Sequence, residues 1–270
     1  RSITLNHSKP EGQEVIRKLV ETADVLIENY KVGDLKRFGL DYESLKAINP
    51  RLIYCSVTGF GQDGPMAARP GYDGLFQATG GMMAVTGIPD GQPGAGPLKT
   101  GPSLVDFVTG HNTALAIMGA LMYRNQSGEG QYIDIALLDS SVAMVSHIMQ
   151  DYLISGNAPP RLGNGGNGGG PADLIYCSDG VGIPAAKYNE LSDVWEDVQV
   201  KHRELRARTP HAHAAAGYVD LIESPLAKMS ASPATIRMAP PMLGEHNDEV
   251  LGELGYSAER IAELKEMKII

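Results

Sequence analysis

Short apolar runs alternate with amphipathic segments along the first part of the chain. Residues 1–5, 25–27 and 52–57 are apolar runs that predict strands, and residues 41–47 predict a helix. A further helix is predicted to open at Pro10, because Pro suits the first turn and apolar positions then recur on one face. That face consists of Val15, Ile16, Leu19 and Val20. Strands that alternate with helices predict a mostly parallel sheet covered on both faces.

The middle of the chain repeats this alternation with longer elements. Residues 104–124 are small or apolar over about six turns, which predicts a long, mostly buried helix. A strand containing Ile133 and Ile135 follows, and Asp139 begins the next helix. Helical spacing continues through Val142, Val145, Ile148 and Met149. The glycine-rich run 163–171 predicts a mobile loop or a linker, because glycine has the largest backbone entropy and no side chain to pack.

The last part of the chain is less regular. A charged helix is predicted for residues 191–206, a strand for residues 218–222, and helices for residues 248–254 and 257–267. Ser257 suits the N-cap of the last helix. These elements fall short of a complete second domain, and the sequence has no internal repeats.

The composition indicates a folded protein whose partners are small molecules. A net charge of -9 and a pI near 5.3 argue against a nucleic-acid surface, since phosphate binding needs a basic stripe and the Lys and Arg residues are scattered. No apolar stretch is long enough to span a bilayer and no signal peptide opens the chain, so we expect a cytoplasmic protein with no membrane partner. Cys55 and Cys177 lack the spacing of a metal site, and we expect buried thiols and no metal.

Asp139 is the first candidate for chemistry. It stands where an apolar strand breaks into a helix, and a carboxylate at such a junction can reach a cleft and act as a nucleophile. Aspartates also cap helices at such positions, and from the residues alone capping is favoured over catalysis. Asp134 is the weaker candidate, because it lies within the strand.

Several motifs follow one another in a recognisable order. They are Ala23-Asp24-Val25-Leu26-Ile27-Glu28-Asn29-Tyr30, Asn49-Pro50-Arg51-Leu52-Ile53-Tyr54, Gly59-Phe60-Gly61, Arg69-Pro70-Gly71-Tyr72-Asp73, the run from Gly130-Gln131 to Asp139, and Leu243-Gly244-Glu245-His246. In this combination the chain resembles the family III coenzyme A transferases, to which formyl-CoA transferase, carnitine CoA-transferase and the alpha-methylacyl-CoA racemases belong. The resemblance covers essentially the whole chain.

The chain departs from the family pattern at two places. Family members have a further nucleotide-binding segment before the strand at Arg1, and they have a longer stretch where Gly180 here runs directly into Val181. A domain that starts in mid-strand would leave a sheet edge and core exposed. We therefore favour missing segments over a naturally reduced chain.

The resemblance implies a covalent mechanism in which Asp139 attacks the acyl-CoA thioester and then carries CoA as an aspartyl thioester. It makes Asp139 a catalytic residue rather than a cap. The glycine run is similar to a family loop that closes over the reacting anhydride, which implies roles for Gly168, Gly169 and Gly170. A plain flexible linker is the alternative.

The resemblance also implies a CoA site, with CoA and acyl-CoA as substrates and no tightly bound cofactor. The implied contacts are Leu5, Ser8, Asn29, Tyr30, Arg37, Tyr72 and Asp73. The ring of Tyr30 would stack near adenine and Arg37 would pair with phosphate, although Arg37 alone could equally be a solvated helix charge. Ser8 replaces a lysine of the family.

Tyr72 distinguishes between the two activities found in the family. The racemases carry histidine here, because inversion of an alpha carbon needs a second acid/base group. Tyr72 therefore favours transfer of CoA from an acyl-CoA to a carboxylic acid, short or dicarboxylic. A racemase or epimerase and a catalytically silent CoA-binding protein remain the alternatives.

The implied fold is α/β, with a Rossmann-like parallel sheet in a large domain and a smaller second domain. We expect the large CoA-binding domain over residues 1–160, the glycine loop and a shortened small domain over residues 161–210, and a segment that returns to the large domain over residues 211–270. Family members form an interlocked homodimer, which we expect here too.

Overall fold

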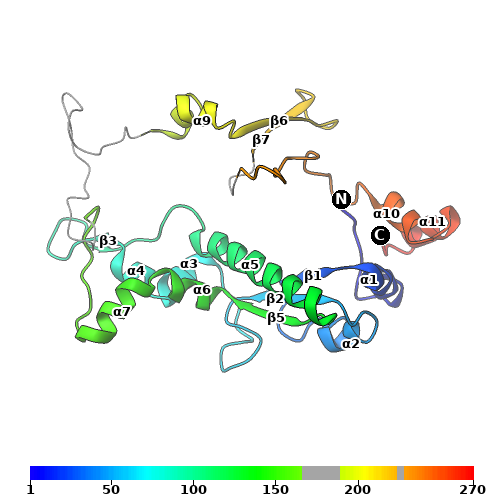
Figure 1. The fold of residues 1–270 in the computed structure, drawn as a ribbon, viewed down its shortest axis with the longest axis horizontal. Helices are drawn as coiled ribbons and strands as arrows, with labels where there is room; N and C mark the ends of the chain where they lie inside the picture. The colour runs from blue at the N-terminus through cyan, green and yellow to red at the C-terminus, as the bar shows by residue number, and fades with distance from the viewer. Residues whose placement is uncertain (166–188, 224–227) are drawn as a thin grey trace. The chain divides into compact units, whose positions relative to one another are not determined.

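The computed structural model describes residues 1–165, 189–223 and 228–270 (Figure 1). The chain divides into two compact units. The larger one, which we call the sheet unit, comprises Leu5–Ile175 and Asp248–Ile270, and the smaller one, the hairpin unit, comprises Arg1–Thr4 and Tyr176–Asn247.

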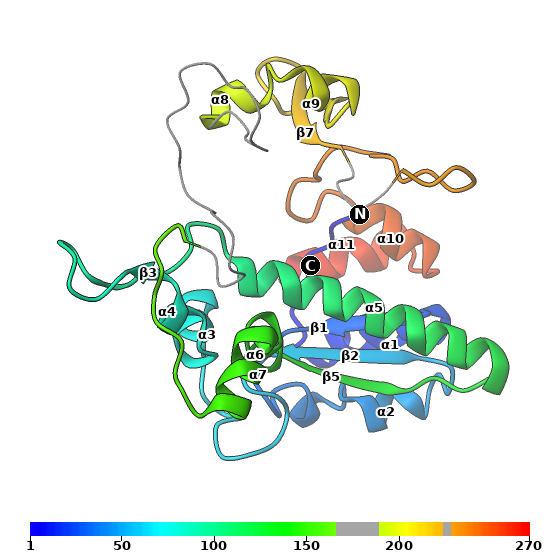
Figure 2. The same cartoon turned by 60° about the vertical axis from the view of Figure 1, so that its left-hand side comes forward.

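The sheet unit is built on a parallel sheet of β1 (Val25–Glu28), β2 (Ile53–Thr58) and β5 (Tyr132–Ala136), with β2 in the centre. Ile27 pairs with Cys55, and Cys55 pairs with Ile133. This confirms the predicted α/β class and parallel sheet. Because the strands are parallel, their carboxyl ends meet at one edge (Figure 2).

The remaining elements of the sheet unit are mostly helices. They are α1 (Pro10–Thr22), η1 (Lys36–Phe38), α2 (Tyr42–Lys46), α3 (Asp73–Thr79), α4 (Met82–Val85), α5 (Leu104–Ser127), α6 (Leu137–Met144), α7 (Ser146–Ser155), α10 (Asn247–Glu253) and α11 (Ala258–Glu266), with a short hairpin of β3 (Gly87–Ile88) and β4 (Gly96–Pro97). The helix predicted at Pro10 is thereby confirmed.

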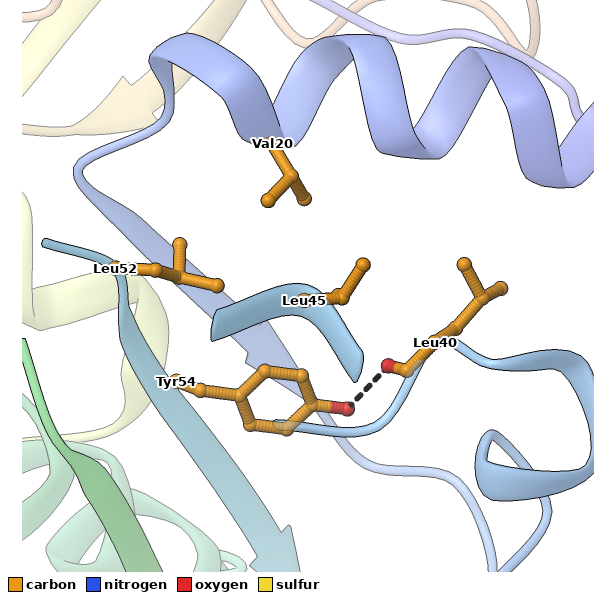
Figure 3. Packing of buried hydrophobic residues seen from close by; sticks show 5 residues of the cluster. All are labelled: Val20, Leu40, Leu45, Leu52 and Tyr54. Carbon is orange, nitrogen blue, oxygen red and sulfur yellow. Dashed lines mark hydrogen bonds between the residues drawn. The ribbon is translucent and has the colours of Figure 1, made fainter. Parts of the chain in front are cut away.

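The apolar face of α1 packs on the start of β2 through a buried cluster (Figure 3). The cluster consists of Val20, Leu40, Leu45, Leu52 and Tyr54. The hydroxyl group of Tyr54 donates to the carbonyl oxygen of Leu40 at 3.0 Å, so its polar end is satisfied. A second cluster joins Leu251 of α10 to Ile261 and Leu264 of α11 and to Leu5.

The strand predicted for residues 1–5 is wrong. The backbone N–H of Ser2 donates to Nδ1 of His246, and that of Thr4 donates to Oδ1 of Asn247. These two backbone N–H groups therefore form hydrogen bonds with side chains and not with the backbone of a neighbouring strand.

Helix α5 has the predicted length, but the expectation that it is mostly buried is wrong. Of its most apolar 18-residue window, 22% is buried. It packs against β2, β5, α3 and α6, and its exposed side includes Phe107, Leu115, Met118, Met122 and Tyr123. By length and composition alone, α5 is the one helix of the described ranges that could cross a membrane. An element apolar all round gives no sequence signal for which side is covered.

The helix predicted from Asp139 to Met149 is two helices. α6 starts at Leu137, and the helix is interrupted at Val145, where φ is -103° and ψ is 16°. Apolar spacing continues across the break, so the periodicity did not reveal it.

In the hairpin unit the helix predicted for residues 191–206 is also wrong. It is replaced by α8 (Leu191–Val194), α9 (Val198–His202) and the start of β6 (Arg206–Pro210). The Asp197 side chain accepts hydrogen bonds from the backbone N–H groups of Gln199 and Val200 and so caps the N-terminus of α9. The predicted strand at 218–222 is confirmed as β7 (Tyr218–Ile222), which pairs antiparallel with β6.

Candidate active site

A cleft of about 900 Å³ lies at the carboxyl edge of the parallel sheet. Its walls are the segment after β1, the end of β2, the loop 67–72, the first half of α5 and Leu137 at the start of α6. Ligands of open parallel sheets bind outside the carboxyl ends of the strands. The position of the cleft therefore makes it the candidate active site.

Three of the predicted CoA contacts lie together in this cleft. Asn29 and Tyr30 come directly after β1, and Tyr72 ends the loop from β2. The side chains of Tyr30 and Tyr72 are 45% and 85% exposed, so both rings can receive a ligand. The ring of His7 meets that of Tyr30 edge-on, with 5.1 Å between centroids, and orients it.

Three other predicted contacts are outside the lining. Leu5 packs against the cluster of α10 and α11. The hydroxyl of Ser8 donates to Asn6 Oδ1 at 2.6 Å. Arg37 stacks on Phe38 and forms an ion pair with Asp34, which does line the cleft.

Asp73 is buried below the cleft rather than in its lining. Its Oδ1 accepts from the backbone N–H groups of Val105 and Asp106, and its Oδ2 accepts from Gln77. Both oxygens are therefore engaged inside the protein.

Asp139 lies in the first turn of α6 and is exposed, but it is not part of the cleft lining. The alternative that it caps the helix is wrong, because the N-cap is Ala136 and no side chain caps α6. Asp134, the weaker candidate, accepts the backbone N–H of Gln62 at 2.9 Å and so holds the loop after β2.

The acidic side chains of the lining are Glu28, Asp34 and Asp106. Glu28 accepts the backbone N–H of Tyr30 at 2.7 Å, and Asp34 pairs with Arg37. Asp106, in the first turn of α5, has no hydrogen bond or ion pair from its carboxylate to any residue that the structure describes. Of these three acids, Asp106 is therefore the one whose carboxylate can bind a ligand without losing a contact to a described residue.

Burial raises the pKa of the Asp106 carboxyl above its usual range, and the negative charge of Asp73 raises it further. Sequence reasoning missed Asp106, because it reads as a polar start to an apolar helix. The available signal was an acid in the first turn of the helix that crosses the carboxyl edge of the sheet.

The loop before α3 is fitted closely to the cleft wall. The ring of Phe76 lies where a side chain at Gly59 or Gly71 would be, so a Cβ at either position would collide with it. These two glycines bring both ends of the loop against α3 and place Tyr72 at the cleft mouth.

Gly168, Gly169 and Gly170, and also Cys177, lie outside the described residues. Cys55 is buried as expected. Within residues 1–165, 189–223 and 228–270, no group of three or more His, Cys, Asp or Glu side chains could hold a metal ion.

Comparison with known proteins identifies the family. The profile of CoA-transferase family III matches residues 1–182. The succinyl-CoA–L-malate CoA-transferase beta subunit of Chloroflexus aurantiacus is 32% identical over 336 aligned positions, which cover 100% of this chain and 82% of that protein. The chain belongs to CoA-transferase family III.

Other family III members extend the comparison. The succinate–glutarate CoA-transferase of Agrobacterium fabrum is 48% identical over 185 residues, covering 68% of this chain and 45% of its own length. The crystal structure of a CAIB/BAIF family protein from Brucella suis matches with a TM-score of 0.84 and 34% identity, covering 94% of this chain and 81% of that chain. The region that matches the Agrobacterium relative is therefore less than half of the full length of that protein.

The alignment with the Chloroflexus subunit contains more positions than this chain has residues. Its 336 positions are 66 more than the 270 residues of this chain. That relative therefore carries residues within the aligned span that have no counterpart here.

Proposed function

We propose that the protein transfers CoA from an acyl-CoA to a carboxylic acid, with Asp106 as the covalent nucleophile. The observation that carries the proposal is the free carboxylate of Asp106 in the same cleft as Asn29, Tyr30 and Tyr72. Geometry moves the nucleophilic role from Asp139, the candidate from the sequence, to Asp106. Family membership supports the reaction class.

The reaction proceeds through two anhydrides and one thioester. The Asp106 carboxylate attacks the thioester carbonyl of the donor, and CoA thiolate leaves to give a mixed anhydride. The thiolate attacks the aspartyl carbonyl and releases the donor acid, which leaves an aspartyl-CoA thioester. The acceptor carboxylate attacks this thioester and expels CoA thiolate. The thiolate then attacks the acceptor acyl carbon, which restores Asp106 as a carboxylate.

The covalent route keeps the free energy of the thioester bond in each intermediate. Exchange of CoA between two carboxylic acids is close to thermoneutral, so hydrolysis of any intermediate would waste the thioester.

Short dicarboxylic acids are the proposed substrates. The relatives are named for succinate and glutarate and for succinyl-CoA and L-malate. The cations of Lys31 and Arg69 line the cleft, and neither side chain forms an ion pair with a described residue. Either cation can receive a second carboxylate of the substrate.

Racemisation is disfavoured by the same lining. No histidine is among the residues that line the cleft in the described ranges, and Tyr72 occupies the position where racemases carry one. Deuterium exchange at the alpha carbon of an acyl-CoA measures this activity, and rapid exchange would contradict the assignment.

We also propose that the protein works in the cytoplasm as a homodimer. The exposed apolar residues of α5 support an association between copies. Sedimentation velocity measures the assembly, and a monomer at micromolar concentration would contradict it.

The activity is tested by exchange of a labelled dicarboxylic acid into its CoA ester. Asp106→Asn removes the charged nucleophile and is expected to lower the exchange rate by about 10³-fold or more. The matched control, Asp139→Asn, is expected to stay within about threefold of the wild type, since Asp139 is outside the lining. The reverse pattern would return the nucleophilic role to Asp139, and loss of neither rate would leave a silent CoA-binding protein.

A further inference from the structure

The loop between β2 and α3 brings its last residues to the cleft. Residues 59–72 contain no helix or strand, and the stretch 67–72 lines the cleft wall. Within that stretch, Arg69 carries a cation and forms no ion pair with a described residue. A loop of this length has no regular structure that would fix its course. The position of the Arg69 guanidinium group therefore depends on what holds the loop.

The start of the loop is fastened to β5 and α6. The backbone N–H of Leu138 donates to the carbonyl oxygen of Gly59 at 3.0 Å. The backbone N–H of Gln62 donates to Oδ2 of Asp134 at 2.9 Å. Between these two contacts Gly61 has a φ of 89°, which glycine adopts without strain, and an added Cβ there would lie 3.6 Å from the same carboxylate oxygen. The Asp134 carboxylate is therefore a side-chain anchor for the start of the loop.

Beyond Gln62 the loop is held by its own turns. The backbone N–H of Ala67 donates to the carbonyl oxygen of Gly64 at 3.3 Å, and that of Arg69 donates to the carbonyl oxygen of Met66 at 2.9 Å. Residues 63–70 form no hydrogen bond or ion pair with another element of the described ranges. A displacement of Gln62 therefore moves Arg69 as well.

The two cations of the cleft lining have different surroundings. Lys31 lies in the segment after β1, together with the carboxylates of Glu28 and Asp34, which offset its charge. Arg69 lies in the stretch 67–72, which contains no acidic residue. A guanidinium group also binds a carboxylate through two parallel hydrogen bonds, which an ammonium group cannot do. Arg69 is therefore the better partner for a carboxylate of the substrate.

We propose that Arg69 receives the second carboxylate of the dicarboxylic acid, and that Asp134 is a positioning residue that holds the loop in the place this requires. The inference rests on the proposed function and names the side chain that selects the substrate. A monocarboxylic acid of the same length leaves the guanidinium group unpaired, so it gains less from binding. Arg69 thus makes the charge at the far end of the acid the property that the cleft recognises.

Competition between two acceptor acids tests Arg69. Labelled succinate and butyrate, which have equally long carbon chains, compete for CoA from the donor succinyl-CoA. The initial ratio of the two labelled CoA esters reports the ratio of the kcat/KM values, in which effects on the donor cancel. We expect the wild type to favour succinate and Arg69→Gln to lower the ratio by about 10- to 100-fold. An unchanged ratio in Arg69→Gln would overturn the inference.

The same ratio tests Asp134. Asp134→Ala removes the oxygen that accepts the Gln62 N–H, and we expect the ratio to fall about fivefold as Arg69 is displaced. Asp134→Asn keeps an acceptor oxygen and is expected to stay within about twofold of the wild type. Asp63→Ala is the matched control and is expected to leave the ratio unchanged, because Asp63 is exposed in the same loop and lies outside the cleft lining. A merely structural Asp134 would lower thermal stability and both kcat/KM values together without changing the ratio, which would overturn its positioning role.

Arg69→Gln keeps the test decisive if Asp134→Ala does not fold, because the exposed side chain of Arg69 forms no ion pair with a described residue. Failure of the proposed function is distinguishable, since the wild type would then form neither labelled ester. A wild type that transfers CoA to both acids without preferring succinate would overturn the role of Arg69 while leaving the transfer reaction itself intact.

Discussion

At the scale of single residues, chemical availability separates side chains that look alike in the sequence. Asp134, Asp139 and Asp106 all lie near the carboxyl end of a strand or the start of a helix. Asp134 is used to hold a loop, and Asp106 lines the cleft. Asp139 is exposed in the first turn of α6, two residues after Leu137 of the lining. The motif order predicted the family, but it did not predict which acid faces the cleft, because that depends on how α5 crosses the sheet edge.

The thiol of Cys55 gives a prediction at the same scale. Its pKa is raised to about 11, first by burial and then by the charges of Glu28 and Asp134. In a Cys177→Ser background, we expect the folded protein to resist a disulfide reagent at about pH 8 and to react fully once unfolded in urea. Reaction of the folded protein at the rate of a free thiol would contradict this.

At the scale of elements, the sequence predicted those with a regular alternation of faces or a short apolar run. α1 and β7 were confirmed because one face is more buried than the other, and β2 was confirmed as a short, buried apolar run. The breaks at Val145 and around Asp197 were missed, since apolar or charged residues continue across them. A local capping residue can start a new helix without changing the hydrophobic pattern.

Tyr54 tests how the first core cluster is held. Tyr54→Phe removes the hydrogen bond to the buried carbonyl oxygen of Leu40, and we expect a loss of about 1–2 kcal/mol in the free energy of unfolding. Urea denaturation measures it. Tyr152→Phe is the control, because Tyr152 is exposed in α7, and equal losses in the two variants would argue against the bond.

At the scale of the whole molecule, the sheet unit joins two distant parts of the sequence. α10 and α11 bring Leu251, Ile261 and Leu264 against Leu5. The ring of Tyr256 accepts the ammonium group of Lys18 from α1 at 4.0 Å. The predicted boundaries near residues 160 and 210 stay predictions, as do the homodimer and its location.

Leu264 tests whether this return of the chain supports the sheet unit. Leu264→Ala leaves a cavity among buried side chains, and we expect a loss of about 2–5 kcal/mol in the free energy of unfolding. Leu153→Ala, at an exposed position of α7, is expected to cost much less. The two variants can be compared by urea denaturation; a similar small cost for both would show that α11 contributes little.

The central claim is that Asp106 becomes covalently bound to CoA during turnover. Its most direct test is mass spectrometry of the protein incubated with succinyl-CoA and treated with hydroxylamine, which converts an aspartyl thioester to a hydroxamate. We expect the hydroxamate on the peptide that contains Asp106 and none in the Asp106→Asn variant. A hydroxamate at Asp139, or no modified aspartate at all, would contradict the account.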